Sequence, residues 1–87
     1  MVCDCCRKRK KLLESFASVD TTKGKMNLCV ICNDLAYKIR DDAENKDLES
    51  FMKHIGELEK REKRAKPVFV GWKKGFIKEL KNVYFDE

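Results

Sequence analysis

Apolar residues recur at helical spacing in the second half of this chain. Between residues 48 and 58 they stand three or four positions apart, as on one face of a helix: Leu48, Phe51, Met52, Ile55 and Leu58. We therefore predict an amphipathic helix that begins near a break at residues 45–47, with Asp47 as the candidate N-cap. One bent helix over residues 33–65 is the alternative. Residues 59–64 are all charged, so we expect this helix end to protrude into solvent until Pro67 terminates it.

A second apolar pattern follows Pro67. Residues 68–72 form an apolar patch that suits a short strand or a packed connector. Large side chains then recur every four residues, with lysines between them: Trp72, Phe76, Leu80 and Tyr84. This spacing predicts a final amphipathic helix that ends at about Tyr84. Most of both stripes should be core. Eight or nine large apolar residues nevertheless exceed what a small domain covers easily, so these four are also a candidate surface for a protein partner or a homodimer.

The first third of the chain has the shorter period of strands. Residues 12–19 alternate loosely between apolar and polar positions, which suits a half-buried strand. Residues 20–25 have the composition of a turn, since Gly24 can adopt a positive φ angle and Asp20 can bond the backbone ahead of it. Residues 26–28 would begin a return strand. We therefore predict a short β-hairpin.

Four cysteines flank the predicted hairpin in two pairs of C-x2-C spacing. They are Cys3, Cys6, Cys29 and Cys32, and the 22 residues between the pairs include no cysteine or histidine. Two such thiolate pairs can complete a closed tetrahedral shell around structural Zn²⁺, with no open position for a substrate. Cys5 is the alternative to Cys6, but pairing it with Cys3 would need a tighter loop, so we expect Cys5 to be a free thiol near the metal. A thioredoxin-type redox pair is disfavoured, because this chain is too helical and charged for that fold.

The order of these features resembles a treble-clef zinc finger: a cysteine pair, a hairpin, a second pair and a helix, for which Asn33 and Asp34 supply capping or first-turn residues. The resemblance covers residues 1–44 and departs from the pattern at Arg7, where small residues often relieve the turn. Treble clefs occur in nucleases, ribosomal proteins, ubiquitin-related domains and transcription factors, so the resemblance implies a scaffold rather than an activity.

Catalysis is disfavoured by the position of the single histidine. Treble-clef nucleases of the HNH type need a histidine at the hairpin as a general base and a further ligand for a catalytic metal. The sequence has only His54, on a predicted helix far from both cysteine pairs, where we expect it to be solvated or partly packed. We therefore expect no catalytic residues.

Length and cysteine content indicate how the fold is stabilised. A chain of 87 residues makes one domain at most and buries too little surface to be stable without a cross-link. Zinc is favoured over disulfides, because five cysteines leave one unpaired and no secretory signal opens the chain. The longest uncharged stretch is eight residues, far short of the ~20 that span a bilayer.

These observations predict a small α+β, zinc-stabilised protein of the reducing cytoplasm, with no membrane partner. It would have a treble-clef-like finger with a short hairpin at residues 1–44. Two or three amphipathic helices would follow, with residues 45–87 as a helical extension packed on the finger or continuous with it in one compact domain.

Charge points to a binding role. The formal net charge is +5, and four thiolates around one Zn²⁺ would lower it to about +3. Five basic residues follow the first cysteine pair without a break: Arg7, Lys8, Arg9, Lys10 and Lys11. Held beside a rigid zinc site, they could meet successive phosphates.

Three functions follow in order of preference. The first is a non-catalytic regulatory or interaction protein whose basic segment binds nucleic acid phosphate, in DNA or RNA, or an acidic surface. The second is an adaptor or inhibitor that modulates host transcription or replication machinery and docks through its C-terminal helices. A nuclease-like enzyme is the least favoured, because a closed metal shell leaves no place for a substrate.

Overall fold

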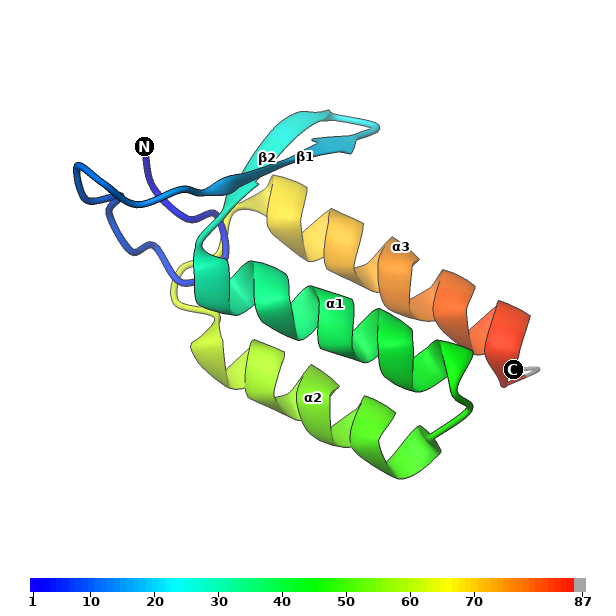
Figure 1. The fold of residues 1–87 in the computed structure, drawn as a ribbon. Helices are drawn as coiled ribbons and strands as arrows, with labels where there is room; N and C mark the ends of the chain where they lie inside the picture. Colours follow the sequence, from blue (N-terminus) through cyan, green and yellow to red (C-terminus); the bar gives the residue numbers. More distant parts are fainter. Residues whose placement is uncertain (86–87) are drawn as a thin grey trace.

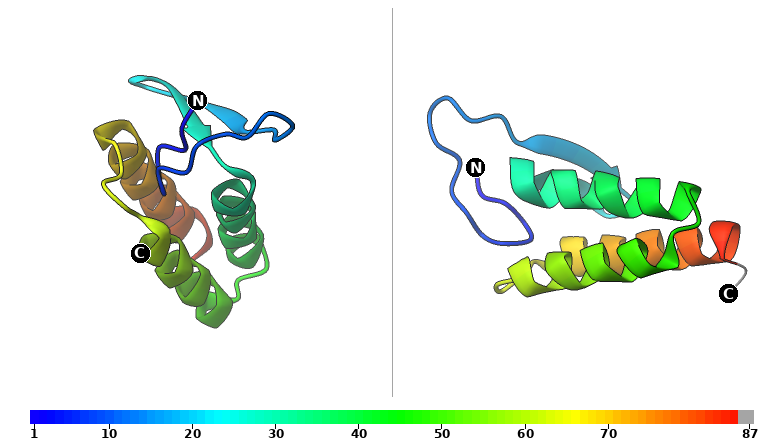
Figure 2. Two further views of the ribbon diagram at one scale, coloured as in Figure 1. Left: turned by 90° about the vertical axis from the view of Figure 1, so that its left-hand side faces the viewer. Right: turned by 60° about the horizontal axis from the view of Figure 1, so that its bottom comes forward.

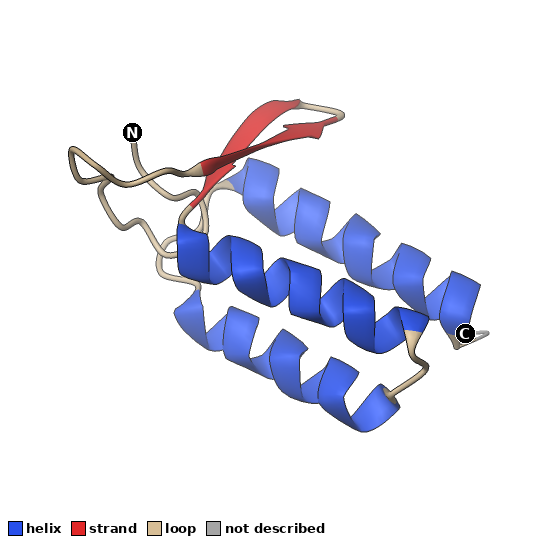
Figure 3. Ribbon diagram, viewed as in Figure 1, coloured by secondary structure: helices blue, strands red, loops and turns tan. Residues whose placement is uncertain are grey.

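A β-hairpin followed by three helices makes up the chain in this computed structural model, which describes residues 1–85 (Figure 3). The hairpin strands are β1 (Ala17–Thr21) and β2 (Gly24–Leu28), which pair antiparallel with Ala17 opposite Leu28. The helices are α1 (Val30–Glu44), α2 (Leu48–Arg61) and α3 (Pro67–Tyr84). The predicted small α+β class, with a hairpin ahead of the helices, is therefore confirmed.

The three helices lie side by side, each antiparallel to the one before it (Figures 1 and 2). Helix α1 contacts both α2 and α3, so the segment predicted as the finger helix also carries the C-terminal extension. The hairpin and the N-terminal segment lie at the end of the helical layer where α1 begins, α2 ends and α3 begins (Figure 1). The molecule is elongated, measuring 41 × 23 × 19 Å, with this end at one extreme.

The core lies between the helices and strand β2. Side chains buried almost completely come from all of these elements: Met26, Leu28, Ile39, Phe51, Leu58 and Phe69. Each side chain of this kind contributes roughly 1.5–3 kcal/mol when removed from water. The apolar stripe predicted for α2 is only partly buried, because Leu48 and Met52 at its edge stay 50% and 49% exposed.

The N-terminal strand begins later than predicted. Residues 12–19 were expected to form it, but β1 starts at Ala17, and Leu12 and Leu13 occupy a turn where they are 94% and 95% exposed. The physical reason is local hydrogen bonding by Glu14. Its carboxylate accepts from the backbone N–H of Lys11 at 2.8 Å, and its own N–H donates to the Lys11 carbonyl at 3.2 Å. Such side-chain bonds compete with strand formation.

The hairpin turn has the predicted glycine but a different polar residue. Gly24 adopts φ +111°, as expected. The expectation for Asp20 is wrong, because Asp20 lies within β1 opposite Lys25. Thr21 holds the turn instead: its hydroxyl donates to the Gly24 carbonyl at 2.6 Å and accepts from the Lys23 N–H at 3.1 Å. A threonine hydroxyl can replace an aspartate in this role.

The helix boundaries resolve the two alternatives for residues 33–65 in favour of two helices. Helix α1 ends at Glu44, and Asp47 caps α2 by accepting from the Ser50 N–H at 3.1 Å. The start of α1 differs from the prediction, because the helix begins at Val30 with Cys29 as its N-cap, ahead of Asn33 and Asp34.

The segment around Pro67 also differs from the prediction. Helix α2 ends at Arg61 rather than at the proline, and Pro67 is the first residue of α3. Proline suits this position, because its fixed φ is helical and its missing N–H would have no helical partner. Residues 68–72 are therefore the first turns of α3, not a strand or connector. Among residues 1–85, no helix is long and apolar enough to cross a membrane.

Candidate metal centre

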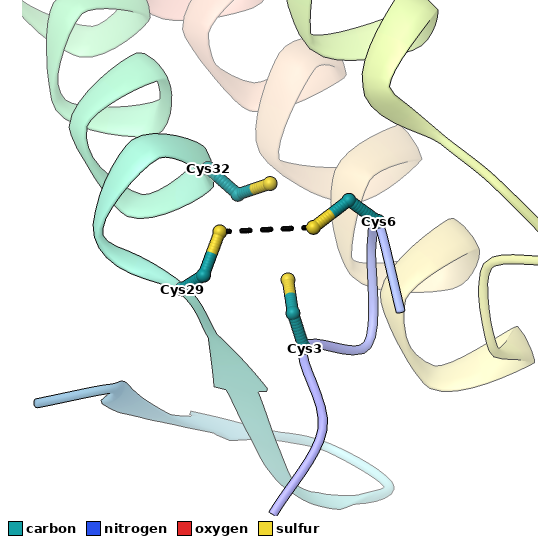
Figure 4. Close-up of side chains that lie close together, drawn as sticks. All are labelled: Cys3, Cys6, Cys29 and Cys32. Carbon is teal, nitrogen blue, oxygen red and sulfur yellow. Dashed lines mark hydrogen bonds between the residues drawn. The ribbon is translucent and has the colours of Figure 1, made fainter. Parts of the chain in front are cut away.

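Four cysteine thiols converge where the N-terminal segment meets the start of α1 (Figure 4). Their Sγ atoms all lie within 4.8 Å of one another, and Cys3, Cys29 and Cys32 are buried while Cys6 is partly exposed. We call these four residues, Cys3, Cys6, Cys29 and Cys32, the thiol cluster. They are the four residues that C-x2-C spacing selects in the sequence.

The cluster has the dimensions of a tetrahedral metal site. Zinc–sulfur bonds of about 2.3 Å place the corners of a tetrahedron about 3.8 Å apart. The Sγ atoms of Cys6 and Cys29 are 3.7 Å apart, which also is far beyond the ~2.05 Å of a disulfide. All five cysteines are free thiols. Four sulfurs in this arrangement suit one metal ion, and among common metals the all-thiolate tetrahedron is typical of zinc.

A tight turn positions the first pair of thiols. The Arg7 N–H donates to the Cys3 carbonyl at 3.0 Å, and the Cys3 N–H donates to the Lys8 carbonyl at 2.9 Å. To close this turn Arg7 adopts φ +67°, a left-handed conformation that favours glycine. Arg7, where the sequence departs from the small residue usual in a treble-clef turn, therefore also has a strained backbone conformation.

The start of helix α1 positions the second pair. Cys29 is the N-cap, in an extended conformation, and Cys32 lies in the first helical turn. The Asn33 N–H donates to the Cys29 carbonyl at 2.9 Å, which begins the helix between the two thiols. Helix N-termini carry a partial positive charge, and this one lies beside the cluster, where a zinc–tetrathiolate group would be negative.

Asp4 connects the first pair to the rest of the fold. Its side chain is buried, and one carboxylate oxygen accepts from the Asn27 N–H of β2 at 2.8 Å. The backbone of Asp4 donates to the Asn27 carbonyl at 2.8 Å and accepts from the Lys66 N–H at 3.0 Å. Asp4, inside the first C-x2-C pair, therefore joins the N-terminal segment to both the hairpin and the α2–α3 linker, which is residues 62–66.

Cys5 lies outside the thiol cluster, although it is the alternative ligand in the sequence. It is fully buried in the core, and its carbonyl accepts from the Lys63 N–H at 3.1 Å. Its thiol is not one of the four clustered sulfurs, although it interacts with the Cys32 thiol.

The cluster needs a cation to ionise. The neighbouring Cys32 thiol, together with burial, raises the pKa of Cys3 to about 12. Burial also raises the pKa of Cys6. Without a metal these two thiols would therefore stay protonated at neutral pH, whereas a bound divalent cation would displace their protons.

Arg61, at the end of α2, contacts the cluster and was not predicted from the sequence. Its Nε–H donates to Cys32 Sγ at 3.3 Å, and Nη2 lies 3.8 Å from Cys6 Sγ and 3.9 Å from Cys29 Sγ. The Cys32 sulfur raises the pKa of Arg61, so the guanidinium stays charged. One indication was present in the sequence, because Arg61 stands three residues after Leu58 and continues the buried face of α2.

The charged segment 59–64 is exposed only in part: four of its residues are exposed as predicted, but Arg61 and Glu62 are half-buried. Besides Arg61, Glu62 forms an ion pair with Lys73 of α3, which is itself buried and lies 3.4 Å from Glu59. The backbone of Lys63 bonds Cys5. These contacts fold the α2–α3 linker over the first cysteine pair, because charged side chains that pair with each other or with sulfur can be buried.

The predicted basic segment is exposed throughout: Arg7, Lys8, Arg9, Lys10 and Lys11. One member is already paired, because Lys8 Nζ lies 2.7 Å from a carboxylate oxygen of Glu14. This bond raises the pKa of Lys8 and lowers that of Glu14. The five cations are therefore not equivalent.

The residues predicted to bind a partner line one face of α3. Leu80 is buried, and Trp72, Phe76 and Tyr84 are partly buried against the core. The rings of Trp72 and Phe76 stack with centroids 4.8 Å apart. His54 lies away from the cluster, and its Nδ1 is 2.5 Å from the Asp42 carboxylate, which joins α2 to α1.

Comparison with known proteins gives no relative: no protein-family model, no curated protein and no solved structure matches the chain.

Proposed function

We propose that this chain is a non-catalytic zinc protein with a treble-clef-type finger, and that its exposed basic segment, Arg7–Lys11, binds the phosphates of a nucleic acid. The observation that supports this proposal most is the closed group of four sulfurs within 4.8 Å of one another. Four thiolates fill the coordination shell of zinc, so the metal holds the fold together instead of activating a substrate.

The covering of the cluster supports a structural role for the metal. Arg61 lies over three of the sulfurs, and its charge would partly offset the −2 of a zinc–tetrathiolate group. Three of the four cysteines are buried. A catalytic zinc instead keeps a coordination position for water or substrate.

The place of the basic segment supports phosphate binding. It follows Cys6 directly, so its first residues are held by the turn that the metal would fix. Cations on a rigid support lose little conformational entropy when they bind phosphate. The alternative, docking of a protein through α3, is supported by a shallow apolar hollow of 190 Å³ lined in part by Tyr37, Trp72 and Phe76.

The zinc proposal is tested by the metal content of reduced protein. We expect one zinc per chain, which Cys6→Ser should lose and Cys5→Ser should keep. Cys5→Ser is the matched control, because it removes a neighbouring thiol that lies outside the cluster. Metal-free protein at full stability, or equal loss of zinc in both variants, would contradict the proposal.

The nucleic acid proposal is tested by fluorescence anisotropy with labelled duplex DNA and RNA at several salt concentrations. Affinity should fall steeply with salt and should drop when Arg7, Lys8, Arg9 and Lys10 are neutralised together, since each phosphate contact releases counterions. The α3 variant Trp72→Ala serves as a comparison and should change a protein-docking function instead. Absence of salt-sensitive binding would reject this function.

A further inference from the structure

The α2–α3 linker brings a second pair of cations beside the first cysteine pair. Lys63 and Arg64 are exposed and, with Arg7 and Arg9, line a hollow of 490 Å³. Val2 and Cys6 complete its lining. Residues 7–9 and 63–64 are more than fifty positions apart in the sequence, so only the fold makes them one surface. We call the hollow lined by the four cations Arg7, Arg9, Lys63 and Arg64 the basic groove.

The cations of the basic groove are unpaired, whereas several of their neighbours are not. Within residues 1–85, no ion pair involves Arg7, Arg9, Lys63 or Arg64. No acidic residue lines the groove. The acids nearest in sequence have other partners: Glu62 pairs with Lys73, Glu14 with Lys8, and Asp4 is buried against Asn27. Four uncompensated positive charges around one hollow create a local potential that attracts anions.

Both walls of the groove are anchored at the thiol cluster. Arg7 follows Cys6 in the turn closed on the Cys3 carbonyl, and the Lys63 N–H donates to the Cys5 carbonyl at 3.1 Å. Arg61, two residues before Lys63, bonds three of the sulfurs. The spacing of the two walls therefore depends on the metal centre, and the groove is preorganised for its ligand.

Two of the four cations occupy backbone positions that favour glycine. Arg7 has φ +67° and Arg64 has φ +52°. A left-handed conformation is strained for a non-glycine residue. At both positions the side chain is an exposed arginine, which can donate two N–H groups to a phosphate.

We propose that the basic groove, with walls from residues 7–9 and 63–64, is the site that holds the sugar–phosphate backbone of a nucleic acid duplex. This proposal rests on the proposed function and assigns its binding surface. The groove contains arginines, which bind phosphate with two N–H groups at once, and no aromatic side chain on which an unpaired base could stack. Backbone contacts without stacking are typical of duplex binding that does not read sequence.

The test compares two double variants that remove the same charge. Lys63→Gln with Arg64→Asn neutralises the linker wall, and asparagine is chosen because it tolerates the left-handed backbone at residue 64. Lys23→Gln with Lys25→Gln is the matched control, since both lysines are exposed at the hairpin turn and belong neither to the basic segment nor to the groove. Zinc content and circular dichroism of each variant establish that the fold is retained.

Binding to a labelled duplex of about 20 base pairs should weaken about tenfold or more in the linker variant at about 100 mM salt, and the salt slope should fall by about two. The control variant should lose much less. Equal losses in the two variants, with wild-type binding intact, would overturn the groove but keep the proposed function. The same variants are also tested for binding to single-stranded nucleic acid and to polyglutamate. If neutralising Lys63 and Arg64 weakens either of these more than it weakens duplex binding, the duplex is not the ligand. Absence of wild-type binding to any nucleic acid would reject both proposals.

Discussion

The Arg61 guanidinium contacts the sulfurs of the candidate metal centre. It lies within 3.9 Å of three sulfurs and carries the opposite charge. We expect Arg61→Gln to weaken zinc affinity about 10- to 100-fold, because partners that bond the ligands of a metal are worth this much. The zinc affinity of Arg61→Lys should lie between those of the wild type and Arg61→Gln, since lysine keeps the charge but lacks the planar guanidinium with its several N–H donors.

Competition with a chromophoric chelator measures this change in zinc affinity. Arg40→Gln is the control, because Arg40 is an exposed arginine of α1 that pairs with Glu44 and has no contact with the cluster. An unchanged zinc affinity in Arg61→Gln would show that the guanidinium contributes packing alone.

Arg7 carries a conformational cost that glycine would remove. We expect Arg7→Gly to raise the free energy of unfolding of the zinc-loaded protein by about 0.5–1 kcal/mol, because φ +67° is strained for arginine and accessible to glycine. Urea denaturation measures this change. Arg9 does not have a positive φ, so Arg9→Gly should lower the free energy of unfolding instead. The same Arg7→Gly variant should lose duplex affinity, so stability and binding would change in opposite directions.

Among the elements, α2 depends on its N-cap. The Asp47 carboxylate accepts from the Ser50 N–H, which would otherwise have no partner in the first turn. We expect Asp47→Ala to lower the free energy of unfolding by about 1 kcal/mol and Asp47→Asn to change it little. Thermal denaturation at fixed zinc concentration compares the two. If both variants lose the same stability, the negative charge matters and not the hydrogen bond.

At the scale of the whole molecule, the metal centre and pH are linked. In the metal-free fold the pKa of Cys3 is about 12, above that of an unfolded thiol at about 8.5. A raised pKa in the folded state contributes stability that is present below pH ~8.5 and is lost as the pH rises toward 12. With a chelator present, we therefore expect raising the pH from about 7 to 10 to reduce the remaining helicity.

The zinc-loaded protein should respond in the opposite sense. Its ligands are already thiolates, so the same rise in pH should leave its circular dichroism unchanged, and acid below about pH 5 should release the metal. A metal-free chain that is equally helical at pH 7 and 10 would contradict this linkage. Because the cluster lies at one end of a 41 Å molecule, the loss should begin where α1 starts and α2 ends.

The elements that were predicted correctly have strong local causes. Asp47 and Gly24 fulfil their predicted roles because capping and positive φ depend on a few neighbouring residues. The strand predicted at residues 12–19 failed because Glu14 forms hydrogen bonds within a turn, which a loose apolar alternation does not reveal. The prediction that residues 59–64 are solvated failed for Arg61 and Glu62, because their partners, the cysteines and Lys73, are distant in sequence.

The sequence alone determined which side chains could bind a metal and where most of the helical segments lie. Both depend on spacing along the chain, since a C-x2-C pair forms half a tetrahedron and a three- to four-residue period forms a helix face. Only the tertiary structure decided that Arg61 covers the sulfurs and that Lys63 and Arg64 face Arg7. Arg61 and Cys6 are 55 residues apart, and no local pattern encodes such a contact, because it depends on how α2 packs against α1.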